Sequence, residues 1–159
     1  MRTIERSEKL EITLERISKE DCDLLFNWAN DTEVRKNSFN SDKILYENHI
    51  KWFNNKINSD KCSIFILKEN RISVGQVRID IENSTAIISY SIDKNYRGKG
   101  LSVILLSLLE EKIRNNNINI KKMVGLVKFD NVASQKAFEA LKFDKKICNN
   151  FLEYEKYLI

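Results

Sequence analysis

Residues 95–102, Asn-Tyr-Arg-Gly-Lys-Gly-Leu-Ser, separate a strand-like apolar run from a segment with helical periodicity. The run Ala86–Asp93 predicts a strand, and Leu101–Ile113 predicts a helix. The first turn of a helix has unpaired backbone N–H groups and partial positive charge. Gly98 and Gly100 let the backbone approach a ligand. Arg97 and Lys99 add formal positive charge. This stretch predicts an anion site that suits phosphate, or else a basic strand–turn–helix link.

The N-terminal third of the chain predicts one strand and two helices. Apolar and charged residues alternate over 10–17, which indicates a half-buried strand. Ser18–Asp21 resembles a capping box that opens a helix ending at Asn30-Asp31. Residues 32–44 are polar and are expected to form a loop with one apolar anchor. The next helix begins at Leu45 and places five positions on one face, namely Leu45, His49, Trp52, Phe53 and Ile57.

The rest of the chain predicts an antiparallel meander followed by a helix, a returning strand, a helix and a hairpin. The expected strands are 62–67, 72–81, 86–92, 122–127, 143–148 and 151–159, and the expected helices are 101–113 and 132–141. Gly75 is expected to mark a bulge, and Asn149-Asn150 suits a type I′ hairpin turn. The sum is one mixed α/β domain over residues 1–159, with its core at about 10–159.

Composition limits the classes of partner. The 159 residues carry a net charge of +4, with basic and acidic residues interleaved, so nucleic acid is not an expected partner. No apolar run approaches the length of a membrane span, so no membrane is expected. Three scattered cysteines and one histidine do not suit a zinc cluster, and no metal is expected. Three unpaired thiols and a charged N-terminus without a signal segment predict a cytoplasmic location.

Two sequence elements resemble those of the GNAT superfamily of acetyl-CoA-dependent N-acetyltransferases. That family has an Arg or Gln, two residues, Gly, one residue, and then Gly or Ala; here the element reads Arg97-Gly98-Lys99-Gly100-Leu101-Ser102, with Ser at the last position. The second element is an asparagine, a helix of small residues and a Leu-Gly-Phe ending. It spans Asn131–Phe143 here, with Lys142 in place of the usual Gly. The two elements together are more specific than either alone, and the resemblance covers residues 10–159.

The resemblance implies a GNAT-like α/β fold with a central mixed, mostly antiparallel sheet. The sheet would be splayed between strands 4 and 5 and flanked by about four helices. Acetyl-CoA would be the co-substrate, with its pantetheine arm in the splay beside the backbone of 89–92 and its pyrophosphate on 97–102. The residues implied for the cofactor are Ser91, Ile92, Arg97, Gly98, Lys99, Gly100, Leu101, Ser102, Asn131 and Phe138.

Residues 26–53 resemble more narrowly a branch of that family associated with nucleotide-sugar modification, which includes the enzyme that acetylates a 4-amino sugar nucleotide in pseudaminic acid biosynthesis. Ribosomal-protein N-terminal acetyltransferases share a looser version of this opening, so a protein N-terminus stays open as the acceptor. Aromatic rings stack on sugars and bases, and arginine pairs with diphosphate. The candidate acceptor-binding residues are Trp28, Arg35, Phe39, Asn40, Trp52 and Arg78; core packing is the alternative for both tryptophans. A homodimer is compatible with the sequence.

Acetyl transfer requires a neutral amine, a stabilised oxyanion and a proton for the departing thiolate. His49 is the only histidine and a candidate base, with packing on its helix face or sugar binding as alternatives. Many GNAT enzymes have a tyrosine seven residues after the asparagine, but this chain has Phe138 there, which cannot donate a proton. Tyr90, Ser134 or bound water are the candidate donors, and each side chain has a structural role as its alternative. The missing tyrosine also leaves open an acyl-CoA-binding domain without turnover.

Overall fold

Alternating apolar side chains build one seven-stranded sheet, which the computed structural model describes through residues 10–116 and 119–158. The strands are β1 (Ile12–Arg16), β2 (Cys62–Glu69), β3 (Ile72–Glu82), β4 (Thr85–Ile92), β5 (Lys122–Val127), β6 (Asp144–Ile147) and β7 (Leu152–Tyr157). The α-helices are α1 (Cys22–Ala29), α2 (Thr32–Asn37), α3 (Tyr46–Ile57), α4 (Leu101–Asn115) and α5 (Val132–Ala140), with short 3-10 helices η1 (Lys19–Asp21) and η2 (Lys94–Tyr96). The ends of the predicted domain, 1–9 and 159, lie outside the described residues.

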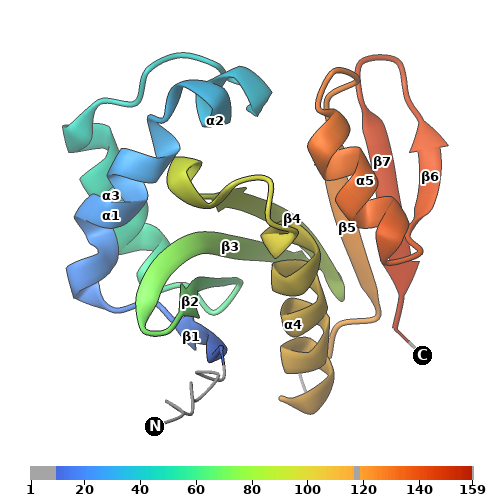
Figure 1. The fold of residues 1–159 in the computed structure, drawn as a ribbon, viewed down its shortest axis with the longest axis horizontal. Coiled ribbons are helices and arrows are strands. Elements are labelled where there is room, and N and C mark those ends of the chain that lie inside the picture. Colours follow the sequence, from blue (N-terminus) through green and yellow to red (C-terminus); the bar gives the residue numbers. More distant parts are fainter. Residues whose placement is uncertain (1–9, 117–118, 159) are drawn as a thin grey trace, which may run out of the picture.

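The strand order is β1-β2-β3-β4-β5-β7-β6, and β4 with β5 is the one parallel pair in this sheet. β2, β3 and β4 form the expected meander, and α4 connects β4 to β5 (Figure 1). The two turns of the meander, Asn70-Arg71 and Asn83-Ser84, have positive φ at both residues. That is the type I′ geometry, which matches the twist of the strands it joins. The mixed, mostly antiparallel sheet expected from the sequence is therefore confirmed.

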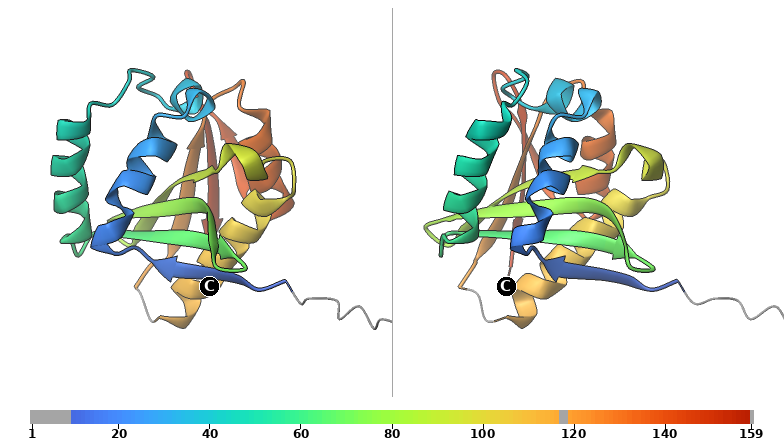
Figure 2. Two further views of the ribbon diagram at one scale, coloured as in Figure 1. Left: turned by 60° about the vertical axis from the view of Figure 1, so that its left-hand side comes forward. Right: turned by 90° about the vertical axis from the view of Figure 1, so that its left-hand side faces the viewer.

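Helices cover both faces of the sheet, with α1 and α3 on one side and α4 on the other (Figures 1 and 2). The alternation within β2 shows the division: Ile64 and Ile66 pack with α1 and α3, whereas Phe65 and Leu67 belong to the larger cluster. The larger cluster also contains Val77, Ile79, Leu105, Leu106, Leu109, Met123, Phe138 and Tyr154. Burying one such large apolar side chain stabilises the fold by about 1.5–3 kcal/mol, so this face carries most of the stability.

β4 and β5 pair over only part of their length. Their register runs from Thr85 opposite Lys122 to Ile88 opposite Gly125. Beyond that point β4 continues beside β3, and β5 continues beside β7. The two strands therefore diverge, which is the splay that the sequence predicted.

Glycine is required at the last pair of the splay. A Cβ on Gly125 would lie 2.8 Å from Cε1 of Phe138, so α5 packs its ring directly on the backbone of β5. The bulge predicted at Gly75 is also present, because the register between β2 and β3 shifts beside Leu67 and leaves Val74 unpaired. The freed carbonyl of Val74 accepts a hydrogen bond from Asp93 N at 2.8 Å, which fixes the end of β4.

Three details differ from the sequence-based expectations. The loop expected over 32–44 begins with α2, because Asp31 Oδ1 accepts from the N–H groups of Glu33 and Val34, both at 3.2 Å, and caps this polar helix. Leu45, expected on the buried face of α3, is its N-cap and is 63% exposed.

The prediction of a type I′ turn at Asn149-Asn150 is wrong, since neither residue has positive φ. The helix α2 brings the α-helices of the described chain to five, against the four or so expected.

Candidate active site

The splay opens into a cleft of about 1390 Å³. Side chains from both faces of the sheet line it. On the β4 side, Tyr90 and Ile88 face the α4 and α5 layer, whereas Ser89 and Ser91 face the opposite layer with Gln76 of β3. The cleft therefore passes through the sheet, so that two ligands could enter from opposite faces and meet where the strands diverge.

The turn before α4 has the geometry of an anion site. Gly98 and Gly100 have φ of 77° and 75°, and a Cβ on either would meet no atom within 4 Å. Glycine stands there because of the left-handed backbone conformation, which costs other residues about 1–2 kcal/mol, and the space around it stays open. Leu101 is 5% exposed and anchors the start of the 15-residue helix α4. The unpaired N–H groups of that helix start face the cleft beside Ser102.

Arg97, at the start of this turn, connects three elements. Its Nε donates to Ile92 O at 3.1 Å, its Nη2 to Asp31 Oδ1 at 2.7 Å and its Nη1 to Glu33 Oε2 at 3.0 Å. Although burial opposes the charge, the hydrogen bond from Arg97 and the capping N–H groups lower the pKa of Asp31 below its ordinary value. The expected phosphate-binding arginine thus also fixes α2 to the end of β4. Lys99 Nζ lies 5.1 Å from the centre of the Tyr96 ring.

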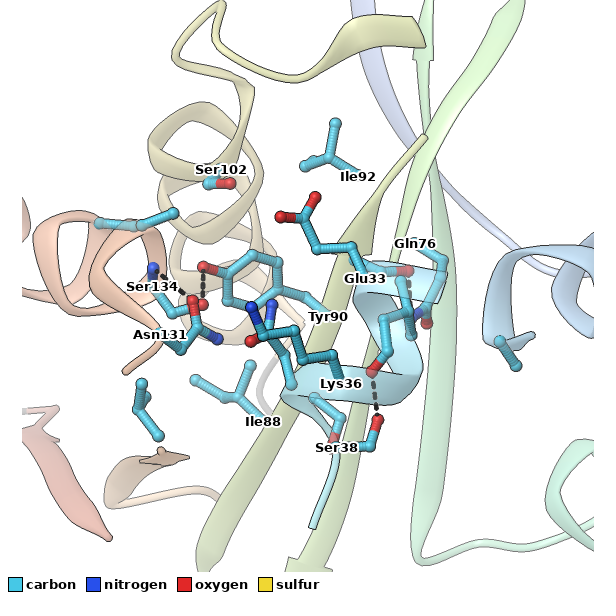
Figure 3. A pocket seen from close by; sticks show the side chains of 18 of the residues that line it. Glu33, Lys36, Ser38, Gln76, Ile88, Tyr90, Ile92, Ser102, Asn131 and Ser134 are labelled. Carbon is cyan, nitrogen blue, oxygen red and sulfur yellow. Dashed lines mark hydrogen bonds between the residues drawn. The ribbon is translucent and has the colours of Figure 1, made fainter. Parts of the chain in front are cut away.

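Tyr90 extends from β4 toward α5 beyond the last β4–β5 pair (Figure 3). Its Oη lies 2.8 Å from Ser134 Oγ. Asn131 caps α5 by accepting the N–H of Ser134 at Oδ1, 3.2 Å away, and Figure 3 shows its side chain in the cleft. The contact with Ser134 uses Oδ1 of Asn131, the oxygen of its side-chain amide. Burial raises the pKa of Tyr90, against the opposing hydrogen bonds of Ser134 and Ser102.

Phe138 contributes only the edge of the cleft. It is 2% exposed, stacks on Tyr154 with ring centres 5.4 Å apart, and meets Tyr90 and Phe143 in T-shaped contacts. Its ring packs on Gly125 through its para carbon, the atom that would carry a hydroxyl in tyrosine. Phe138 is therefore part of the hydrophobic core.

The family model described as "Acetyltransferase (GNAT) domain" matches residues 11–144. The chain belongs to the GNAT acetyltransferase family. It is accordingly an acetyl-CoA-dependent N-acetyltransferase, and the open choice between an enzyme and an acyl-CoA-binding domain without turnover is decided for the enzyme. No curated protein matches the chain in sequence.

Solved structures of low sequence identity share the fold. A domain from Methanocaldococcus jannaschii DSM 2661 superimposes with a TM-score of 0.81 at 24% identity, over 94% of this chain and 100% of that one. The spermidine N-acetyltransferase from Vibrio cholerae, in complex with CoA and spermine, gives 0.82 at 16%, over 92% and 95%. A ribosomal alpha-N-protein acetyltransferase in complex with coenzyme A gives 0.81 at 16%, over 92% and 94%. Their acceptors differ, so the shared fold does not select one.

The single histidine of this acetyltransferase is buried beside the cleft. His49 is 3% exposed, and its Nε2 lies 2.8 Å from Cys22 O. A carbonyl can only accept, so Nε2 carries the proton and Nδ1 is the nitrogen free to accept one. The ring lies among aromatic neighbours, 5.3 Å from Phe26, 5.5 Å from Trp52 and 6.3 Å from Phe53.

Trp52 and Arg78 form a stacked pair on the wall opposite α5. The Arg78 guanidinium lies 5.2 Å from the centre of the Trp52 ring, its Nε donates to Asp80 at 2.9 Å and its Nη2 to Ser89 Oγ at 3.3 Å. Lys56 donates to the other oxygen of Asp80 at 2.7 Å. Trp28, the other tryptophan, is 7% exposed in the α1–α3 cluster, so core packing describes it.

The remaining predicted acceptor residues lie on α2 and the loop after it. Arg35 donates to Ala29 O at 2.6 Å, to Asn40 O at 3.0 Å, to Asp42 O at 3.2 Å and to Ser38 Oγ at 3.2 Å. These four contacts fold the loop back on α1, so its guanidinium shapes the wall of the cleft. Phe39 lines the cleft and is 56% exposed, and its ring centre is 5.9 Å from that of Phe151.

Sequence reasoning missed several cleft residues. Gln76, whose Nε2 donates to Ser91 Oγ at 3.1 Å, sits two residues before Arg78 on β3. Gln76 and Arg78 alternate along β3 with the buried Val77 and Ile79. This alternation could have shown that Gln76 lies on the same polar face as Arg78. Asp31, read only as the end of a helix, is the cap that positions α2. In the described ranges 10–116 and 119–158, no group of three or more His, Cys, Asp or Glu residues suits a metal, and no helix is long and apolar enough to cross a membrane.

Proposed function

We propose that this acetyltransferase transfers the acetyl group of acetyl-CoA to a primary amine of a nucleotide-linked amino sugar. The donor enters between α4 and α5, with its pyrophosphate on 97–102 and its pantetheine along the free edge of β4. The acceptor enters from the α1 and α3 face. Holding both substrates in one cleft converts a bimolecular reaction into a step within a complex, which supplies a large part of the rate enhancement.

The observation that best supports this acceptor is the charge of the side chains that line the cleft. Among the described residues that line it, five side chains are basic and two are acidic, namely Arg35, Lys36, Arg78, Arg97 and Lys136 against Glu33 and Asp130. Glu33 is already paired with Arg97. Polycationic amines need unpaired carboxylates, whereas a diphosphate needs arginine or lysine. Arg97 belongs to the donor turn, and Arg35 is held by loop carbonyls. Arg78 and Lys36 are therefore the cations of the wall that we propose for an acceptor that carries phosphate as well as its amine.

Trp52 and Arg78 are the residues proposed to hold the nucleotide part. Arginine presents a planar fork that matches phosphate oxygens, and its stacking on Trp52 and its bond to Asp80 orient that fork beforehand. Asn40, exposed in the loop after α2, completes the sugar side of the wall.

The proposed chemical step uses groups on β4 and on α3. Backbone N–H groups near Ser91 are proposed to stabilise the oxyanion of the tetrahedral intermediate. His49 is proposed to receive the proton of the amine at Nδ1, directly or through a water, because its Nε2 is held by Cys22 O. If His49→Ala keeps near-normal turnover at every pH, the base role of His49 is wrong.

The test of the acceptor is a mass-spectrometric search for acetylated product. Acetyl-CoA and the enzyme are incubated with a UDP-linked 4-amino sugar, spermine, kanamycin or a ribosomal N-terminal peptide. The proposal expects product with the UDP-linked sugar at the highest kcat/KM. Preferred acetylation of the peptide would support N-terminal acetylation instead, and preferred acetylation of spermine or kanamycin would show that the basic wall does not exclude polycations.

A further inference from the structure

We propose that Tyr90 protonates the departing thiolate of coenzyme A and that Ser134 positions the Tyr90 hydroxyl for this step. The inference concerns the donor half of the reaction, so it holds for whichever amine accepts the acetyl group. It places the proton donor on the splayed edge of β4 and not on α5, where this chain has Phe138.

The position of Tyr90 on β4 and the direction of its side chain support its role as the proton donor. It follows Ile88, the last β4 residue paired with β5, so it stands on the free edge where the predicted pantetheine runs. Its side chain crosses the cleft and places Oη 2.8 Å from Ser134 Oγ on the first turn of α5 (Figure 3). The side chain of Asn131, the cap of the same helix, lies beside this pair. A hydroxyl donor is thus held next to the residue expected to contact the thioester arm.

Phe138 has no proton to donate, and its ring is part of the hydrophobic core. The face of the ring packs on the backbone of Gly125 near the para carbon. The ring also contacts Tyr90, with centres 6.1 Å apart at 67°. Phe138 therefore forms an apolar wall that fixes the Tyr90 ring from one side, while Ser134 fixes its hydroxyl.

The protonation state fits a general acid. Burial raises the pKa of Tyr90, so the phenol keeps its proton at neutral pH and can donate a hydrogen bond. The departing thiolate accepts that hydrogen bond as the C–S bond breaks, and the proton then passes to sulfur. Ser134 can turn its own hydroxyl toward Tyr90 Oη and stabilise the phenolate that forms.

The amine nitrogen forms its bond to the acetyl carbon and loses one proton to a base or water, which gives a tetrahedral oxyanion. The C–S bond then breaks, its electron pair passes to sulfur, and the oxyanion becomes the amide carbonyl. Sulfur takes the Tyr90 proton, and the phenolate regains one from water.

The experiment measures the acidity of bound coenzyme A and needs no acceptor. The ultraviolet absorbance of the thiolate is followed from pH 6 to about 10 in the CoA complex, with desulfo-CoA as the blank for the protein's own tyrosines and cysteines. The variants are Tyr90→Phe and Ser134→Ala. The matched control is Tyr157→Phe, which removes an exposed phenol on β7. CoA affinity is measured by calorimetry for each protein.

The Tyr90 hydroxyl donates to the thiolate, so it makes the bound thiol more acidic. Tyr90→Phe is expected to lower the acid dissociation constant of that thiol about tenfold, and Ser134→Ala about threefold. CoA affinity at pH 6, where the thiol is protonated, and the Tyr157→Phe titration should be unchanged. With any acceptor that turns over, the single-turnover rate of Tyr90→Phe should fall about 10–100-fold. Thiol titrations identical to the wild type in both variants would overturn the proposal. A loss of CoA affinity without a change of thiol acidity would give Tyr90 a structural role instead.

Discussion

Lys142 adopts a left-handed backbone conformation that residues with a side chain rarely adopt. It follows α5 with φ of 62°, and its N–H donates to Glu139 O at 3.0 Å. The sequence identified this position by its resemblance to a Leu-Gly-Phe ending, and the structure shows the left-handed conformation for which glycine is usual. The conformation comes from the closing turn of the helix and is the same whichever residue occupies it.

Replacing Lys142 by glycine should stabilise the protein. Relief of the left-handed strain, about 1–2 kcal/mol, exceeds the added flexibility of the unfolded chain, so the net gain is about 0.5–1 kcal/mol. Denaturant unfolding of Lys142→Gly measures it. Lys146→Gly, at an exposed position of β6, is the matched control and should lose stability. A loss of stability in Lys142→Gly would contradict this explanation.

Gly125 should be intolerant of any side chain. Its Cβ would lie 2.8 Å from two ring atoms of Phe138, which is itself enclosed by Tyr154 and Phe143. Gly125→Ala is expected to cost at least about 1–3 kcal/mol through overpacking, with a lower midpoint of thermal unfolding. The double variant Gly125→Ala with Phe138→Leu should recover part of that loss. If Gly125→Ala unfolds at the wild-type temperature, the ring does not pack on β5 as described.

At the scale of elements, α2 is the part that sequence patterns did not find. Five of its six residues are polar and none of the six is buried, so its sequence shows no hydrophobic periodicity. Its position depends on contacts far apart in the chain: Arg97 binds its N-terminus, and Lys128 Nζ donates to Lys36 O at 2.9 Å near its C-terminus. Such contacts follow from the fold and cannot be read from local sequence.

The attachment of α2 to the anion turn should depend on the charge of Asp31. Asn also caps helices, so Asp31→Asn removes the ion pair with Arg97 and keeps the cap; the expected cost is about 1–3 kcal/mol in the free energy of unfolding. Glu33→Gln is the matched control, since its side chain is 61% exposed and should matter by less than about 1 kcal/mol. Equal effects of the two substitutions would contradict the role given to Asp31.

The same ion pair predicts an acid limb of stability. The pKa of Asp31 is lowered in the folded chain, so its contribution is fully present above the ordinary aspartate value of about 3.9 and is lost as the pH falls through the lowered value. Unfolding free energies between pH 6 and 3 should therefore fall less steeply for Asp31→Asn than for the wild type. Parallel curves would show that Asp31 titrates normally.

At the scale of the whole molecule, the order of elements, the meander and the anion turn were predictable from local periodicity, glycine and charge. The splay was implied by the family resemblance alone. The resemblance at Arg97–Ser102 and Asn131–Phe143 supplied the family, which the family match confirms. The sequence could not predict which groups particular side chains contact. Arg35 was a candidate to bind diphosphate, and its guanidinium is held by loop carbonyls. Tyr90 was one of several candidate proton donors, and its hydroxyl lies beside that of Ser134.

The acceptor is the central claim, and one ratio tests it most directly: kcat/KM for a UDP-linked 4-amino sugar divided by kcat/KM for the same amino sugar without the nucleotide. Charge-assisted bonds from Arg78 to the diphosphate should make the ratio about 10–100 in the wild type and should bring it close to one in Arg78→Gln. A wild-type ratio of one, or a ratio that Arg78→Gln leaves unchanged, would contradict the account.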